Sequence, residues 1–204
     1  MPVHGKTKQE IVAEFRRAEI LDAARTVFAS KGFEVATIDD IALATGVAKG
    51  TIYLYYPSKR EIYWAALRAG VDELYAETTR RVDAAHSAHD KIRAFIETKL
   101  EYCEIHHEFF RIYYAAATEV LSHPPERLEV TEPYAQQLGL LERTFDAAQS
   151  RGEIRSVDAA KLAGAVFAVA RGLITQRLLG RTREDIRHDV DFAVDLIWTG
   201  VGRT

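Results

Sequence analysis

The sequence has a single cysteine, Cys103, among 204 residues, and it has no long apolar run. One thiol cannot form an internal disulfide, which is typical of a protein from a reducing compartment. No stretch approaches the roughly 20 apolar residues that a membrane-spanning helix requires. The charged first residues have no apolar run behind them, so they do not resemble a secretory signal. We expect a cytoplasmic protein with no membrane partner.

Catalytic and metal-binding patterns are also missing. The sequence contains no GxSxG, Walker or GxGxxG pattern. Among the seven histidines, neither His86/His89 nor the adjacent His106/His107 has the spacing of metal ligands on one helix face. Cys103 lies one helical turn before His106, but a small buried thiol is the simpler interpretation. We therefore expect no enzymatic activity, no metal and no cofactor.

The total charge does not indicate a nucleic-acid partner, because the chain is acidic by three charges. The distribution is more informative. Residues 1–60 carry 9 Lys/Arg against 7 Asp/Glu, whereas the remainder carries 18 against 23. Only a partner that contacts the N-terminal segment therefore meets a positive balance.

Apolar residues follow helical spacing almost throughout, and strand alternation is nearly absent, which predicts an all-α fold. Gly46 and Gly180 separate neighbouring helices, and Pro57 ends a third one. The prolines of SHPPERLEV, residues 122–130, predict a loop. The predicted helices cover about 14–31, 37–45, 47–56, 59–81, 91–106, 108–121, 132–150, 157–179 and 182–199.

The segment TIDDIALATGVAKGTIYLYYPSKREIY, residues 37–63, has the pattern of a helix-turn-helix with Gly46 in the turn. The second helix of such a pair fits the DNA major groove. Its start has small residues for close approach and a lysine for phosphate, followed by stiff tyrosines with hydroxyl tips. The candidate DNA-binding residues are Thr37, Ala48, Lys49, Gly50, Thr51, Tyr53, Tyr55 and Lys59.

The alternative for the tyrosines is a place in the core of a small bundle. Tyr56 shares a face with Ile52, so we expect it to be a core residue. Tyr53 and Tyr55 point away from that face, so we expect them at the DNA. Thr37 is expected to cap its helix through Asp40 N–H and to offer its hydroxyl and a free N–H to phosphate.

These residues resemble the DNA-binding signature of the TetR family of transcriptional regulators. The shared run is T-x-x-x-I-A-x-x-x-G-V-x-K-G-T-I-Y-x-Y-Y-x-S-K-x-x-I, preceded by FASKGFE at residues 28–34. The resemblance covers about residues 16–67, and beyond it only the helical pattern and the length agree. Ala48 departs from the pattern, because members commonly have serine there.

The resemblance implies a nine-helix protein with a three-helix DNA-binding domain, residues 1–58, and a ligand-binding and dimerisation domain, residues 59–204. It also implies a repressor that leaves DNA when a small molecule binds. The basic residues before and within the first helix either contact phosphate and the minor groove or belong to a solvated tail. These residues are Lys6, Lys8, Arg16 and Arg17.

The last two predicted helices are apolar on more than one side, which favours a homodimer through both of them. Dimerisation would also double the length of DNA that is read. On the last helix, Ile186, Val190, Ala193, Ile197 and Val201 make one face, and Phe192 and Leu196 begin another. An ordinary monomer core would explain one such face but not both.

The middle helices are rich in aromatic residues with a few polar groups among them, a composition typical of a pocket for an apolar or aromatic small molecule. For each residue, core packing or an internal salt bridge is the alternative. Arg171 stands among apolar residues and is expected to need an anionic partner. The candidate ligand-binding residues are Phe95, Lys99, Tyr102, His106, Phe110, Tyr113, Tyr114, Phe167 and Arg171.

We therefore predict a homodimeric repressor that binds double-stranded DNA at a palindromic operator and is released by a small-molecule effector. Two alternatives share the fold. One is an activator with the same DNA chemistry, and the other is a ligand-independent DNA-binding or partner-recruiting protein. A filled pocket and DNA affinity indifferent to metabolites would indicate the latter.

Overall fold

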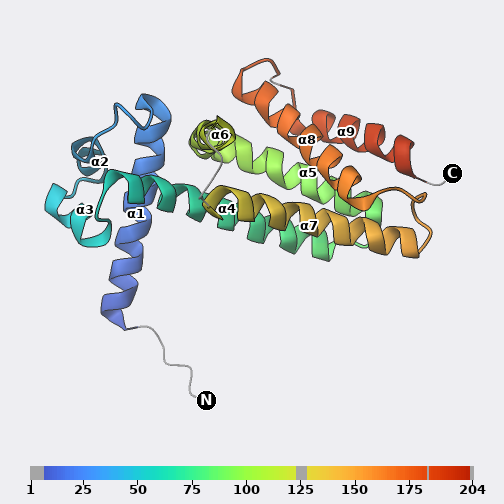
Figure 1. Cartoon of the computed structure of the whole chain (residues 1–204). Coiled ribbons are helices and arrows are strands. Elements are labelled where there is room, and N and C mark those ends of the chain that lie inside the picture. Colours follow the sequence, from blue (N-terminus) through green and yellow to red (C-terminus); the bar gives the residue numbers. More distant parts are fainter. Residues whose placement is uncertain (1–6, 123–127, 183, 203–204) are drawn as a thin grey trace. The chain divides into compact units, whose positions relative to one another are not determined.

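The computed structural model describes residues 7–122, 128–182 and 184–202, with the side chains of residues 119–131 excepted. Within these ranges every regular element is a helix, apart from one isolated bridge between Ile154 and Gly202. The predicted all-α class is confirmed (Figure 1). The helices are α1 (Lys8–Lys31), α2 (Ile38–Thr45), α3 (Lys49–Tyr55), α4 (Lys59–Ala84), α5 (Ala88–Ile105), α6 (His107–Ser122), α7 (Leu128–Ser150), α8 (Ala159–Leu178) and α9 (Ile186–Val201).

The first compact unit contains the described residues up to Gly70 together with Glu108–Ala116. Its α1 packs against α2, and α2 packs against α3. The core is made by aliphatic side chains with no solvent exposure from α1 to α4, and Phe28 and Tyr63 pack edge to face beside them. Those aliphatic residues are Ile20, Ile41, Ile52 and Ile62.

The second unit contains Val71–His107 and the described residues from Ala117 onward. Its α5 packs against α7, α8 and α9, while α7 also packs along α8 (Figure 1). None of the described helices is long and apolar enough to cross a membrane. The predicted division at residues 58 and 59 is a division by function, and it stays a prediction. The fully buried large side chains of this unit include Ile92, Phe95, Ile96, Leu100, Leu141, Phe145 and Ile154.

Local capping explains where the helices begin. Thr7 caps α1 in a capping box with Glu10, so this helix begins earlier than the periodicity predicts. Ser87 accepts a hydrogen bond from Asp90 N–H and starts α5 before the predicted boundary. Both caps are polar residues that hydrophobic spacing alone does not reveal.

The predicted loop over 122–130 is wrong in part. Residues 128–130 belong to the first turn of α7, and Ser122 belongs to the last turn of α6. The prolines lie upstream of the α7 start, and a proline restricts itself and the residue before it rather than those that follow. Residues 123–127 lie outside the described part of the chain.

Candidate DNA-binding surface and effector site

The turn between α2 and α3 is built on one glycine. Gly46 has φ 70° and ψ 18°, a left-handed conformation that glycine adopts without steric cost. Its N–H closes α2 on the carbonyls of Ala42 and Leu43, and the N–H of Val47 donates to the Ala42 carbonyl at 3.2 Å. The two helices are therefore joined by a tight turn, as the sequence predicts for a helix-turn-helix.

Helix α3 has one buried and one exposed side. Ile52 is fully buried, whereas Lys49, Gly50 and Tyr53 are exposed, with 47% of Tyr53 accessible to solvent. Thr51, Tyr55 and Tyr56 are half-buried, and burial raises the pKa of the Tyr56 phenol. The exposed side therefore collects the small, cationic and phenolic groups that the sequence assigns to DNA.

Of two further residues at this surface, Tyr55 has a side-chain contact within the unit and Ala48 makes no capping bond. The guanidinium of Arg17 lies 5.8 Å from the centroid of the Tyr55 ring, a cation–π distance. Ala48 is the N-cap of α3, and its methyl side chain makes no capping hydrogen bond. A serine there would accept such a bond, so the departure from the family pattern removes a local contact.

The exposed lysine of α3 has an acidic neighbour on α2. The Nζ of Lys49 lies 2.8 Å from Asp39 Oδ2, and this hydrogen bond raises the pKa of Lys49. Both side chains are open to solvent, so the pair is weak and exchangeable. Sequence reasoning missed Asp39 as a competitor for this lysine, because ten residues and a turn separate the two.

Thr37 forms a complete capping box at the start of α2. Its Oγ1 accepts from Asp40 N–H at 3.1 Å, and its own N–H donates to Asp40 Oδ2 at 3.0 Å. Hydrogen bonds from Lys31 and then from Thr37 lower the Asp40 pKa to about 2. The predicted cap is confirmed, and the N–H that the sequence leaves free is used inside the box.

Lys59 has an internal role in this structure. Its Nζ donates to the carbonyl oxygens of Phe33, Glu34 and Ala36 at 2.6, 3.1 and 3.0 Å. An ammonium has three donors, so all of them are used by the turn between α1 and α2. The predicted phosphate contact of Lys59 stays a prediction, and it would require the ammonium to leave these carbonyls.

Three of the predicted ligand-binding residues meet in the second unit. Lys99 is 4% exposed, and its Nζ lies 4.8 Å from the centroid of Phe95 and 5.0 Å from that of Phe167. The ammonium also donates to the Oε1 of Gln137, and the Phe167 ring packs edge to face on Tyr134 at 4.9 Å. We call these five residues, from α5, α7 and α8, the Lys99 cluster.

The pKa of the Lys99 side chain is unusually low for a lysine. Burial removes the ammonium from water and lowers its pKa from 10.5 to about 7. The two aromatic faces and the amide oxygen offset this loss only in part. A buried amine that exists in both protonation states near neutral pH can respond to the charge of a bound molecule.

The other predicted ligand residues form separate groups. In the second unit, the Tyr102 hydroxyl donates to Glu73 Oε2 at 2.9 Å. The centroid of the Tyr102 ring lies 4.2 Å from the centroid of the His106 ring. In the first unit, Phe110, Tyr113 and Tyr114 pack with centroid distances of 5.7 to 6.0 Å. All remain predictions as ligand contacts.

Arg171 is exposed to solvent, whereas Cys103 is buried. Arg171 lies on the exposed side of α8, so its charge does not require a buried anion. Cys103 is fully buried, and burial raises the pKa of its thiol to about 11. A protonated, inaccessible thiol is a poor nucleophile, which agrees with the prediction that Cys103 is a small core residue.

The fold and the exposed face of α3 define a class: an all-α protein with an N-terminal helix-turn-helix domain. Residues 20–66 match the sequence model of a family described as bacterial regulatory proteins, tetR family. Residues 20–66 therefore contain the DNA-binding domain of the TetR family of transcriptional regulators, and the matched relatives are named as transcriptional regulators rather than enzymes.

Two curated relatives extend this comparison. The HTH-type transcriptional repressor KstR2 of Mycobacterium tuberculosis is 31% identical over 109 residues, which cover 53% of this chain and 54% of KstR2. The HTH-type transcriptional activator FasR of Mycolicibacterium smegmatis is 30% identical over 99 residues, covering 48% and 45%. The chain thus spans about half the length of the curated relatives it matches.

A solved structure shows the same fold over most of the chain. The transcriptional regulator FadR of Bacillus subtilis, in complex with stearoyl-CoA, superposes with a TM-score of 0.76. The superposition covers 88% of this chain and 96% of FadR, at 21% sequence identity. At this identity the likeness concerns the fold.

Proposed function

We propose that this protein is a homodimeric transcriptional repressor that binds a palindromic operator and is released by a small, largely apolar or aromatic effector. The observation that carries the proposal is the helix α3, which buries Ile52 and exposes Lys49, Gly50 and Tyr53 beside a tight turn. A protein that meets promoter DNA in this way acts in the cytoplasm.

The exposed glycine supports contact with DNA. A Cβ added to Gly50 would meet no described atom within 4 Å, so packing within the unit does not require glycine there. Glycine in a helix costs roughly 0.5–1 kcal/mol relative to alanine. Close approach of a phosphate backbone or a base edge gives a reason for this cost, and the major groove admits one helix.

The dimer is supported by the second apolar face of the C-terminal helices. Val190, Ala193 and Ile197 of α9 are buried, whereas Phe192 and Leu196 are 64% and 57% exposed. Covering this second face with the same face of another copy would remove it from water. Two recognition helices related by twofold symmetry would then reach half-sites about 34 Å apart, or a multiple of that distance.

The effector is expected at the Lys99 cluster. Aromatic walls with a few polar groups are typical of small-molecule sites, and FadR of Bacillus subtilis was solved with stearoyl-CoA. The effector would release DNA by binding more tightly to a conformation of α4 that misplaces the two recognition helices. The curated relatives include both a repressor and an activator, so a reporter gene decides the sign.

The test is binding to the promoter DNA next to the protein's own gene. We expect wild-type protein to shift a palindromic fragment selectively over a scrambled one. Lys49→Ala and Tyr53→Ala should each lose most of this selective binding while keeping the circular dichroism of the wild type. Selective binding at full strength by the Lys49→Ala/Tyr53→Ala double variant would refute the assignment of α3 as the recognition helix.

A matched control separates this surface from general charge. Lys161 on α8 has an 87% exposed side chain, and Lys161→Ala removes the same charge as Lys49→Ala. We expect Lys161→Ala to bind the operator like the wild type. In a reporter strain that lacks the gene, complementation with wild type should lower expression and Lys49→Ala should not.

A further inference from the structure

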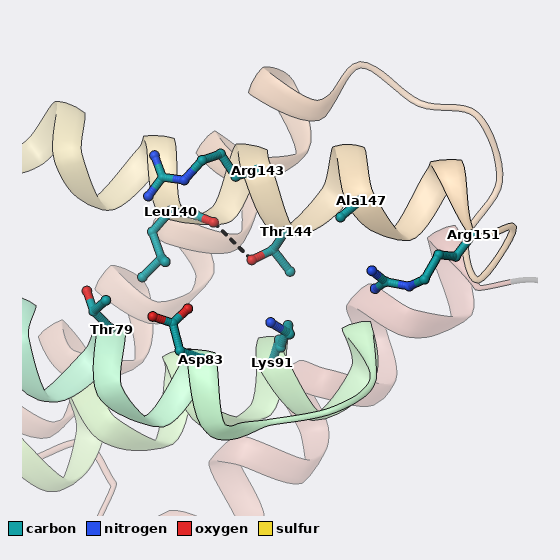
Figure 2. A pocket seen from close by; sticks show the side chains of 8 residues that line it. All are labelled: Thr79, Asp83, Lys91, Leu140, Arg143, Thr144, Ala147 and Arg151. Carbon is teal, nitrogen blue, oxygen red and sulfur yellow. Dashed lines mark hydrogen bonds between the residues drawn. The ribbon is translucent and has the colours of Figure 1, made fainter.

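A pocket in the second unit is lined by residues none of which belongs to the Lys99 cluster. Its volume is about 260 Å³, slightly below the range of roughly 300–1,000 Å³ that is usual for whole small-molecule ligands. It therefore suits one functional group or a small molecule. The pocket is lined by Thr79 and Asp83 of α4, Lys91 of α5, Leu140, Arg143, Thr144 and Ala147 of α7, and Arg151 just after α7 (Figure 2).

Cations dominate the lining of this pocket. Three of the eight residues are Lys or Arg, against one carboxylate, Asp83. Arg151 shares its charge with Glu153, whose other oxygen accepts from Ala88 N–H at 2.9 Å. In the part of the chain that the structure describes, the side chains of Lys91 and Arg143 form neither a salt bridge nor a hydrogen bond. Lys91 is close enough to Glu153 to help lower the pKa of that carboxyl, but neither Lys91 nor Arg143 is held by a hydrogen-bonded anion among the described residues.

The α4 side of the pocket contributes an unused donor. The hydroxyl oxygen of Thr79 is buried, and it has no hydrogen-bond partner among the described residues. Buried hydroxyls are normally paired, and leaving one unpaired costs roughly 1–3 kcal/mol. Figure 2 shows the Thr79 and Asp83 side chains pointing from α4 toward α7, and the Arg151 guanidinium extending toward Lys91. By contrast, Thr144 already donates to the Leu140 carbonyl at 2.9 Å.

We propose that this pocket binds the phosphate group of a small molecule. Its donors come from three helices, α4, α5 and α7, and a phosphate group has enough oxygen atoms to accept from several of them. Lys91 and the arginines supply charge-assisted bonds, and Thr79 supplies a neutral donor. Asp83 accepts from the P–OH of a singly protonated phosphate or from a hydroxyl of the esterified molecule.

This site is independent of the effector proposed at the Lys99 cluster. It has residues of its own, and it requires neither DNA binding nor dimerisation. A phosphate group held here would connect the end of α4 with α5 and α7. The pocket therefore gives the second unit a ligand site in addition to the Lys99 cluster.

The test is calorimetric titration of the full-length protein with inorganic phosphate and, separately, with methyl phosphate. Sodium chloride keeps the ionic strength constant. We expect saturable binding to the wild type and a loss of affinity of about tenfold or more in Lys91→Gln/Arg143→Gln. Because these two side chains form no hydrogen bond or salt bridge among the described residues, the double variant should unfold within a few degrees of the wild-type temperature in the absence of phosphate.

Controls separate the site from general ion effects. Lys161 and Arg187 have 87% and 79% exposed side chains, so Lys161→Gln/Arg187→Gln makes the same charge change elsewhere and should bind phosphate normally. Binding of both probes would indicate an esterified ligand, and binding of inorganic phosphate alone would indicate the free ion. Three outcomes would overturn the proposal: no saturable heat with the wild type, wild-type affinity in the Lys91/Arg143 variant, or acetate binding as tightly as phosphate.

Discussion

The ammonium of Lys99 lies 4.8 Å from the centroid of the Phe95 ring, in a position that is 96% shielded from solvent and has no carboxylate partner among the described residues. Burial of a charge without an ion partner is costly, which is why the pKa falls to about 7. Among the described residues, Lys99 is therefore a group whose protonation is closely tied to folding near neutral pH.

This shift predicts a pH dependence of stability. Between pH 7 and 10.5 the unfolded lysine binds a proton that the folded lysine does not, so the free energy of unfolding should rise with pH. The contribution approaches about 1.4 kcal/mol per pH unit. Urea unfolding from pH 7 to 8.5 measures it below the range in which the Cys103 thiol, with its raised pKa, contributes in the opposite direction.

The control for this prediction is Lys99→Met, which keeps the length of the side chain and removes the charge. We expect the variant to lose the rise in stability over this pH interval. An unchanged slope would show that Lys99 is not the group responsible. If an anionic effector binds at the cluster, its affinity should fall in the same variant.

The Asp39–Lys49 pair predicts a gain of DNA affinity on substitution. Asp39→Asn removes a negative charge 2.8 Å from the lysine that we assign to phosphate, and it leaves Lys49 free for DNA. We expect operator affinity to rise several-fold at low salt and the gain to shrink as salt increases. Fluorescence anisotropy over a series of salt concentrations measures both effects.

The same experiment has a complementary variant. Lys49→Ala should lower the magnitude of the slope of log K against log salt by about one, because one phosphate contact is lost. A slope identical to that of the wild type would show that Lys49 does not contact phosphate. The Asp39→Asn variant should keep at least the wild-type slope.

Substitution of Gly50 by alanine is predicted to stabilise the fold and to weaken DNA binding. Alanine meets no described atom there, so Gly50→Ala should stabilise the fold by about 0.4–1 kcal/mol. Its methyl group would stand between α3 and the DNA, so operator affinity should fall at the same time. Thermal unfolding and anisotropy on one preparation test both parts, and unchanged affinity would contradict close approach at this position.

Placing negative charges at the exposed apolar residues of α9 is predicted to disrupt the dimer. Phe192→Asp/Leu196→Asp should convert the dimer to a monomer, because it places carboxylates in the proposed interface. Sedimentation equilibrium measures the change. Ile105→Asp is the matched control, because Ile105 is 72% exposed but lies on α5, and it should leave the dimer intact. A dimeric double variant would place the interface elsewhere.

The fold was largely predictable from the sequence, for identifiable reasons. The turn at Gly46 and the cap at Thr37 depend on local chemistry, and local chemistry is written in neighbouring residues. The start of α7 was missed because a proline pair indicates a break without indicating how soon the next helix begins.

The site was predictable only in part. Phe95, Lys99 and Phe167 were expected together because aromatic residues concentrate in the middle helices, and the structure brings them together. The pairing of Lys49 with Asp39 and the pocket at Thr79 and Arg151 depend on contacts between separate helices. Such contacts leave no periodic signal along one chain, so a single sequence does not reveal them.

The ammonium of Lys59 holds three carbonyl oxygens of the turn that joins α1 to α2. Acetylation of this nitrogen would leave a single N–H for three acceptors. Such a modification would weaken the turn between α1 and α2. Modification of Lys49 would only weaken the attraction of α3 to DNA. Acetylation of Lys59 and of Lys49, ten residues apart, would therefore have different consequences: the first would lower the stability of the DNA-binding domain, and the second would lower its affinity for DNA.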